Sequence, residues 1–125
     1  MLVFRYLSII EANWNMKNTR LTQHLSTQQL VDCDTGNRGC NGGWYVNALR
    51  YFYTRYAAYE STYAYKAVKG TCQVIAPDQL SPVKLTSFNS GWSPDSVYAL
   101  AQQGPIGVAI WVDGSWSAYK GGIYN

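Results

Sequence analysis

The stretch CDTGNRGCNGGW, residues 33–44, contains two of the three cysteines in the chain, Cys33 and Cys40. The other positions are mostly glycine, asparagine and charged residues, a composition typical of a loop between two regular elements. Three interpretations are open for this segment. It is a metal clamp, it carries a catalytic cysteine, or it belongs to a disulfide framework whose other half lies elsewhere in the sequence.

The spacing of cysteine and histidine argues against a metal clamp. Cys33 and Cys40 are seven positions apart, Cys72 is distant, and His24 is the one histidine of the chain. Structural zinc sites instead bring their ligands in pairs about two to four residues apart. The segment also contains neither G-x-G-x-x-G nor G-K-[ST], the patterns that hold phosphate groups. We therefore predict no metal and no cofactor.

The composition is that of a folded globular domain, because 47% of the 125 residues are hydrophobic and 14% are charged. The net charge of +3 comes from scattered basic residues, so no nucleic-acid partner is predicted. No apolar run approaches the roughly 20 residues that a membrane span needs, so no membrane association is predicted. The start, MLVFRYLSII, lacks a basic leader and a cleavage site, and fits a buried helix better than a signal peptide. Nothing in the sequence indicates the oligomeric state.

Hydrophobic periodicity predicts helices in the first half of the chain. Apolar residues recur at helical spacing over residues 1–17. Ser26 stands three residues before Gln29, the spacing of a capping box, which predicts a short helix that ends near Cys33. A third helix is expected to begin at about residues 42–43, directly after the glycine-rich loop.

The second half of the chain is predicted to contain strands. Residues 57–82 show no sustained period and form a long irregular segment, for which a disulfide at Cys72 would be a natural tether. Ser93, followed by proline, predicts the start of a fourth helix. The order of elements, helices first and strands later, predicts an α+β protein. The strand candidates are residues 82–88, 106–112 and 121–125.

Five motifs occur in an order that resembles the papain family of cysteine peptidases, in its cathepsin L-like and plant papain-like branch. The resemblance extends from about residue 10 to residue 125. The first two motifs and the last one are specific in combination, and chance agreement of all five in order is improbable. They are LSTQQLVDC (25–33), GCNGGW (39–44), a single cysteine in YAYKAVKGTCQ (63–73), GPIGVAIWV (104–112) and YKGGIYN (119–125).

The resemblance implies a two-lobe papain-like fold that is incomplete in this chain. Residues 1–82 would form most of the helical lobe, and residues 83–125 would form the first part of the β-barrel-like lobe. The parent activity would be hydrolysis of peptide bonds in peptide or protein substrates by a thiolate nucleophile. Relatives are secreted or lysosomal, which is the localisation that the resemblance implies.

The resemblance also implies how the cysteines pair. In relatives, the cysteine at the position of Cys33 is bonded to the one at the position of Cys72. The cysteine at the position of Cys40 is bonded to one that lies three residues before the nucleophile. That partner would lie upstream of this chain, so Cys40 is expected to be unpaired here.

The resemblance places none of the usual catalytic residues in this chain. Phe4 and the IIE of residues 9–11 match the spacing that follows the nucleophile in relatives, which puts Met1 at the nucleophile position. A thioether has no proton to lose and cannot form the reactive thiolate. The catalytic histidine and asparagine of relatives would follow Asn125, and the oxyanion glutamine would precede Met1.

We therefore expect a fragment of a papain-like cysteine endopeptidase that is inactive as this chain. The alternative is a non-catalytic homologue that acts as a peptide-binding or regulatory module. His24 is expected to be a surface or locally bonded histidine, because it has no partner placed beside it in sequence. Cys40 is expected to be an ordinary thiol for the same reason.

The residues that resemble a substrate-binding wall follow the second cysteine of the loop. In relatives, the glycine at the position of Gly43, beside Gly42, offers its main-chain N–H and C=O to an extended peptide. Trp44 and Tyr45 correspond to residues that line the second specificity pocket, and Ala109 corresponds to its floor. Two alternatives remain open, because Trp44 is also suited to core packing and the two glycines to a tight turn.

Overall fold

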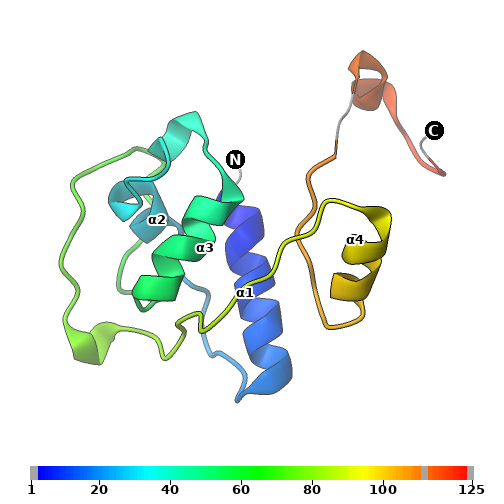
Figure 1. Cartoon of the computed structure of the whole chain (residues 1–125). Helices are drawn as coiled ribbons and strands as arrows, with labels where there is room; N and C mark the ends of the chain where they lie inside the picture. Colours follow the sequence, from blue (N-terminus) through cyan, green and yellow to red (C-terminus); the bar gives the residue numbers. More distant parts are fainter. Residues whose placement is uncertain (1–2, 111–112, 124–125) are drawn as a thin grey trace.

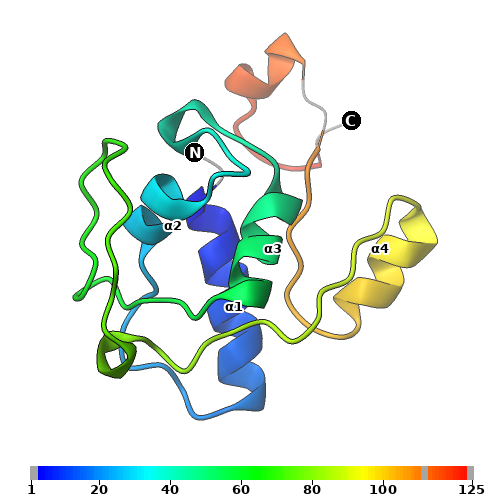
Figure 2. The same ribbon diagram turned by 60° about the vertical axis from the view of Figure 1, so that its left-hand side comes forward.

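The computed structural model describes residues 3–110 and 113–123. Three α-helices form the main body, and α1 contacts both of the others. In Figures 1 and 2, α4 stands apart from these three helices. The elements, in chain order, are α1 (Val3–Lys17), α2 (Thr27–Cys33), the 3-10 turn η1 (Gly39–Asn41), α3 (Tyr45–Thr54), η2 (Pro77–Gln79), α4 (Pro94–Ala101) and η3 (Gly114–Ala118).

Helix α2 begins where the sequence predicts, but only half of the capping box forms. The Ser26 hydroxyl accepts a hydrogen bond from the Gln29 N–H at 3.0 Å, which satisfies one of the free donors of the first turn. The Gln29 side chain reaches the chain after α3 instead of returning to the cap. Its Oε1 accepts from the Ala58 N–H at 2.8 Å, and its Nε2 donates to the Tyr56 carbonyl at 3.1 Å. Gln29 therefore connects two distant segments.

Helix α3 begins at Tyr45, slightly later than predicted. Gly42 has φ +87° and Trp44 has extended φ and ψ angles of −101° and 135°. Neither conformation belongs to a helix, so the chain turns and runs straight before the first helical residue. The glycine-rich loop consequently presents a short exposed segment immediately in front of α3.

The hydrophobic core lies between α1, α2 and α3 and the segments that follow α3. Phe52 of α3 is completely buried, and burial of apolar side chains such as this one is the main force that stabilises the three-helix cluster. In the described part of the chain, no residue after Val83 is buried. The buried members of this core are Leu7, Ile10, Leu25, Leu30, Ala48, Phe52, Ala57 and Val83.

The predicted strands are absent from the described residues. Residues 82–88, 106–110 and 121–123 are irregular, and pairing within residues 3–110 and 113–123 is limited to isolated antiparallel bridges between Leu25 and Tyr59 and between Ala58 and Leu80. β-Branched alternation gives a segment strand propensity, but a strand exists only when a neighbour satisfies its N–H and C=O groups. Within the described residues, 82–88 make only two such bonds, from the Ala57 N–H to the Val83 carbonyl and from the Leu85 N–H to the Phe52 carbonyl, both at 2.9 Å, and no ladder forms. Residues 106–110 and 121–123 make no main-chain hydrogen bond to another described segment. The remaining strand positions, 111–112 and 124–125, lie outside the described residues.

Helix α4 has a well-formed start and little packing. The Ser93 hydroxyl accepts from the Ser96 N–H at 3.2 Å, and the Ser96 hydroxyl accepts from the Ser93 N–H at 3.0 Å. This reciprocal capping and the proline at the first helical position agree with the sequence prediction. None of the residues of α4 is buried. Across the described residues, we also find no helix that has the length and apolar character to cross a membrane.

We predict that α4 unfolds locally while the three-helix cluster stays intact. Its amides should exchange with solvent at least roughly a hundredfold faster than the amide of Phe52, because no buried side chain holds the helix in place. Hydrogen–deuterium exchange followed by mass spectrometry or NMR measures this difference. Equal protection of α4 and α3 would show that the two parts unfold as one unit.

Candidate functional site

The loop between α2 and α3 is organised by the carboxylate of Asp34. This side chain is buried, with 5% of its surface exposed. Its Oδ1 accepts from the Gly36 N–H at 2.9 Å, and its Oδ2 accepts from Nδ2 of Asn37 at 2.6 Å. A short acidic side chain that binds main chain two residues ahead forms a compact turn, which here begins directly after α2.

The far side of the loop is closed onto the start of α3. Oδ1 of Asn37 accepts from the Trp44 N–H at 2.7 Å, and Nδ2 of Asn47 donates to the Gly36 carbonyl at 2.7 Å. Asn47 belongs to the first turn of α3, so the helix itself supports the loop. The segment in front of α3 is therefore held in place by side chains from both ends of the loop.

The candidate wall consists of the predicted substrate-binding residues Gly42, Gly43, Trp44, Tyr45 and Ala109. The geometry of the loop requires both glycines of this wall. Gly42 has φ +87°, a left-handed conformation that glycine adopts without strain. At Gly43, a Cβ atom would lie 2.0 Å from Oδ1 of Asn37, a distance that no real Cβ atom shows. The tight-turn interpretation therefore holds for Gly42, and close approach of another group explains Gly43.

Gly43 is exposed, and its main-chain N–H and C=O make no hydrogen bond within the part of the chain that the structure describes. The neighbouring main-chain groups are occupied. The Gly42 carbonyl accepts from the Arg38 N–H at 2.9 Å, and the Trp44 carbonyl accepts from the Asn47 N–H at 3.1 Å. An exposed, unpaired N–H and C=O on one residue is the arrangement to which an extended peptide can add.

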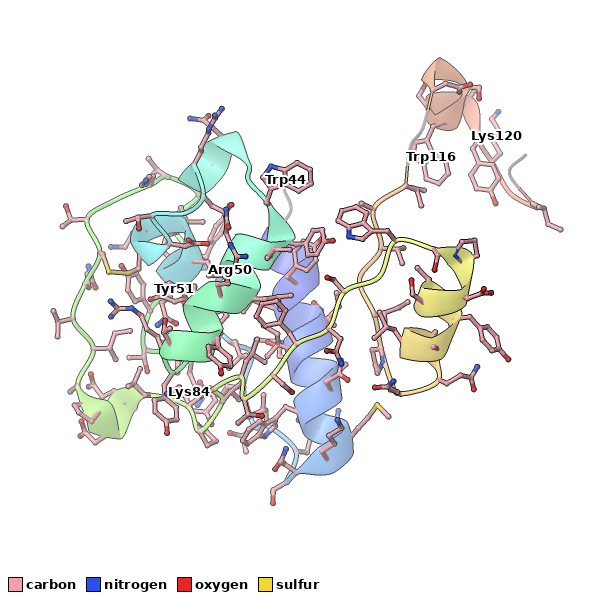
Figure 3. The ribbon with its side chains drawn as sticks, in the orientation of Figure 1. Trp44, Arg50, Tyr51, Lys84, Trp116 and Lys120 are labelled. Carbon is pink, nitrogen blue, oxygen red and sulfur yellow. A yellow bond between two sulfur atoms is a disulfide. The ribbon has the colours of Figure 1, made fainter. Side chains whose placement is uncertain are left out.

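Trp44 and Tyr45 have different environments. Trp44 is 66% exposed, and Figure 3 shows its ring at the start of α3, directed away from the helices. The alternative that Trp44 packs in the core is therefore wrong. The ring of Tyr45 is stacked on that of Tyr6 of α1, with the ring centres 5.5 Å apart. Tyr45 thus fastens α3 to α1 and leaves only part of its surface open.

The segment that carries Ala109 lies against α1. Nδ2 of Asn13 donates to the Pro105 carbonyl at 2.8 Å, and a Cβ atom at Gly107 would lie 3.1 Å from the ring of Tyr6. The Tyr6 ring therefore has Gly107 near it as well as the stacked ring of Tyr45. Ala109 follows two residues later and is exposed.

Two surface hollows occur away from the predicted site residues. One, of about 220 Å³, is lined by residues of α1 and of the turn after it, including Glu11, Arg20 and His24. The other, of about 410 Å³, lies beside Tyr53 and Phe88. Neither hollow is lined by Gly42, Gly43, Trp44, Tyr45 or Ala109.

His24 is a locally bonded surface residue. Its side chain is 89% exposed, and Nδ1 lies 3.1 Å from Oε2 of Glu11. The other oxygen of Glu11 accepts from the Leu25 N–H at 2.7 Å. This environment matches the one expected for His24 from the sequence.

The three cysteines have two different states. Cys33 and Cys72 form a disulfide, the same pair that the resemblance implies, with Cα atoms 4.7 Å apart. Cys40 is free and exposed, and its Sγ lies 3.8 Å from the Ala67 carbonyl. In residues 3–110 and 113–123, no three side chains of histidine, cysteine, aspartate or glutamate gather as metal ligands would. Met1, the residue at the predicted nucleophile position, lies outside the described residues.

Asp32 is a structural residue that the sequence analysis missed. Its carboxylate is 7% exposed and accepts three hydrogen bonds, all between 2.7 and 2.8 Å, from the Gly70 N–H, Nε2 of Gln28 and the Tyr63 hydroxyl. Burial alone raises the pKa of this carboxyl, but these hydrogen bonds outweigh burial and hold the pKa below 3.8. A charged residue within the apolar run LVDC was the available signal, because a buried charge needs partners.

The loop that Asp32 binds lies against η1. Oε1 of Gln28 accepts from the Lys66 N–H at 2.8 Å, and its Nε2 donates to the Val68 carbonyl at 2.7 Å. A Cβ atom at Gly39 would lie 2.8 Å from the Lys69 side chain, so the loop packs closely on η1. Ala67 in this loop has φ +59°, a conformation that is strained for any residue with a side chain.

Comparison with known proteins identifies the family of this chain. The family model described as "Papain family cysteine protease" matches residues 3–125. "Gamete and mating-type specific protein A" of Dictyostelium discoideum is 38% identical over 83% of this chain and 23% of that protein. "Cathepsin L-like proteinase" of Fasciola hepatica is 37% identical over 88% of this chain and 35% of that protein. The chain thus spans about a third or less of the length of these relatives.

A solved structure shows the same partial architecture. Digestive procathepsin L 3 of Tenebrio molitor larval midgut is 34% identical, with a TM-score of 0.60 over 67% of this chain and 27% of that one. The fold of this chain is therefore part of a papain-like peptidase fold. The chain belongs to the papain family of cysteine proteases, whose members act on protein or peptide substrates.

We predict that the folded chain has a single reactive thiol. Of its three cysteines, two form the disulfide, and the exposed Cys40 remains. Titration with Ellman's reagent should detect one thiol per chain without reductant and three after reduction and unfolding. The Cys40→Ser variant should show none before reduction. A value of three in the native wild type would mean that the disulfide does not form.

Proposed function

We propose that this chain supplies one wall of the substrate cleft of a papain-like cysteine endopeptidase. In this proposal, Gly43 binds the main chain of an extended peptide through its N–H and C=O. The complete enzyme hydrolyses peptide bonds through an acyl-thioenzyme, which a cysteine thiolate forms with the substrate. The contribution of the described residues is binding, since His24 is paired with Glu11 and Cys40 lies against Ala67.

The observation that carries the proposal is the free main chain of Gly43. Gly43 is exposed, and neither its N–H nor its C=O has a hydrogen-bond partner in residues 3–110 and 113–123, while the Gly42 carbonyl and the Trp44 N–H on either side of it are bonded. Peptides that bind in extended form use main-chain hydrogen bonds for affinity and pockets for alternate side chains. The exposed ring of Trp44 stands next to Gly43 and offers apolar surface to one such side chain.

The remaining parts of the wall belong to the same proposal. Tyr45 and Ala109 complete the second specificity pocket, and Gly42 supplies the turn that brings Gly43 to the surface. Tyr6 supports a common pocket for Tyr45 and Ala109, because its ring is stacked on the ring of Tyr45 and also lies near Gly107, two residues before Ala109. Met1 takes the position of the nucleophile and contributes no covalent chemistry.

The boundary between the two lobes, the partner of Cys40 and the localisation of the protein are also proposals. We propose that residues 1–82 belong to the helical lobe and residues 83–125 to the β lobe, which is supported by the end of the buried core at Val83. Cys40 then pairs with a cysteine outside this chain. The Cys33–Cys72 disulfide suits an oxidising compartment, in agreement with a secreted or lysosomal protein. The partner is a peptide or protein, with no role for nucleic acid or membrane.

A peptide titration followed by NMR tests the proposal. The blocked tripeptide acetyl-Leu-Phe-Arg-amide should shift the amide signals of Gly43 and Trp44, with a dissociation constant on the order of 1 mM for a single wall. Three peptides, each N-methylated at one residue, serve as matched probes. One of the three should bind about three- to tenfold more weakly, because it lacks the N–H that donates to the Gly43 carbonyl.

Two results would contradict the proposed function. Equal binding of all three methylated peptides would show that no ligand N–H is bonded to Gly43. Shifts confined to residues distant from Gly43, such as those around Tyr53, would place the peptide on another surface. The Gly43→Ala variant provides a second check, because its Cβ would displace the Asn37 side chain and should abolish binding.

A further inference from the structure

We propose that Asn37 is a positioning residue that directs the Gly43 carbonyl toward the bound peptide. This inference rests on the proposed function, because it concerns how the same residue is made ready to bind. Asn37 touches no substrate in this proposal. It acts through the peptide bond that joins Gly43 to Trp44.

The first step is the geometry of that peptide bond. A trans peptide is planar, so its N–H and C=O point in opposite directions. The Gly43 carbonyl shares its peptide unit with the Trp44 N–H. That N–H donates to Oδ1 of Asn37 at 2.7 Å, on the loop side of the chain. The Gly43 carbonyl is therefore directed away from Asn37, toward the exposed face.

The N–H of Gly43 is oriented in the same way, through the planar peptide bond that joins Gly42 to Gly43. The Gly43 N–H shares its peptide unit with the Gly42 carbonyl, which accepts from the Arg38 N–H at 2.9 Å. The Gly43 N–H consequently points away from Arg38. Each free group thus lies opposite an anchored one. One anchor is the main-chain N–H of Arg38, whereas the other is the Asn37 side chain, which an alanine substitution removes without changing the main chain.

The orientation of the Asn37 amide follows from its partners. A carboxylate only accepts hydrogen bonds, so the group that faces Oδ2 of Asp34 at 2.6 Å must be the NH₂ of Asn37. Its oxygen then faces the Trp44 N–H, which only donates. Asp34 is buried and also bound by the Gly36 N–H, so it holds the amide in one orientation.

The same oxygen explains why residue 43 is glycine. Oδ1 of Asn37 occupies the place that a Cβ of residue 43 would take, at 2.0 Å. The bond to Trp44 and a side chain at position 43 therefore exclude each other. Asn37 and Gly43 form a matched pair, in which the absent side chain makes room for the group that orients the main chain.

Three variants of the full chain test the inference. Asn37→Ala removes the acceptor for the Trp44 N–H. The double variant Asp34→Asn/Asn37→Asp exchanges the donor and acceptor of the pair, keeps the total charge and retains an oxygen for Trp44. Thr35→Ala is the matched control, because Thr35 is exposed in the same loop and its side chain has no hydrogen bond to the described residues.

Two readouts are measured for each protein. Without ligand, NMR detects the hydrogen bond directly as a scalar coupling between the Trp44 nitrogen and Cγ of residue 37. With ligand, the dissociation constant of acetyl-Leu-Phe-Arg-amide is taken from the Gly43 amide shift. Asn37→Ala has neither a Cγ nor an acceptor at residue 37, so the coupling cannot arise in this variant, and the peptide should bind roughly five- to tenfold more weakly. The double variant should restore both, and Thr35→Ala should change neither.

The ligand-free coupling separates this inference from the proposed function. Absence of the coupling in the wild type, or unchanged peptide affinity in a folded Asn37→Ala, would overturn the role of Asn37. Failure of the wild type to bind peptide at Gly43 would overturn both proposals, even if the coupling is present. If Asn37→Ala does not fold, the double variant decides, since loss of binding with an intact coupling would also contradict the inference.

Discussion

The buried carboxylate of Asp32 is the interaction on which the loops of this protein depend. It lies on the last turn of α2 and accepts hydrogen bonds from Gln28, from Tyr63 and from the main chain of Gly70, 38 residues further on. A desolvated charge is costly unless several donors surround it, and here one donor belongs to α2 itself and two belong to the irregular segment after α3. The disulfide between Cys33 and Cys72 closes the same region, and a loop of this length contributes about 4 kcal/mol in the chain-entropy model.

This arrangement connects the core to the exposed wall. The segment held by Asp32 and Gln28 packs on η1, where the Lys69 side chain reaches Gly39 and the Ala67 carbonyl lies against Cys40. From η1, the chain passes directly into the extended stretch that contains Gly43. The surface that we propose for peptide binding is thus supported by this segment behind it as well as by the hydrogen bonds of Asp34, Asn37 and Asn47 within its own loop.

Local patterns predicted the helices well and the strands poorly. The capping hydroxyl of Ser26 acts within its own turn, so the sequence nearby was sufficient. Residues 106–110 have the composition of a strand, but a strand depends on a partner that propensity cannot supply. The contacts of Asp32 with Tyr63 and Gly70, and that of Asn37 with the Trp44 N–H, escaped prediction because the partners are distant or belong to the main chain. The exposure of Trp44 could likewise be found only from the folded structure, since a tryptophan side chain suits a core equally well.

The unfolding free energy as a function of pH, compared between wild type and Asp32→Asn, tests the central role of this carboxylate. Its pKa is lowered on folding, so its contribution is present above pH 3.8 and is lost as the pH falls through the folded value. We predict that the variant is less stable by about 1–3 kcal/mol at pH 7 and that the difference disappears in acid below that value. Equal stability at pH 7, or a difference that does not change with pH, would contradict the account.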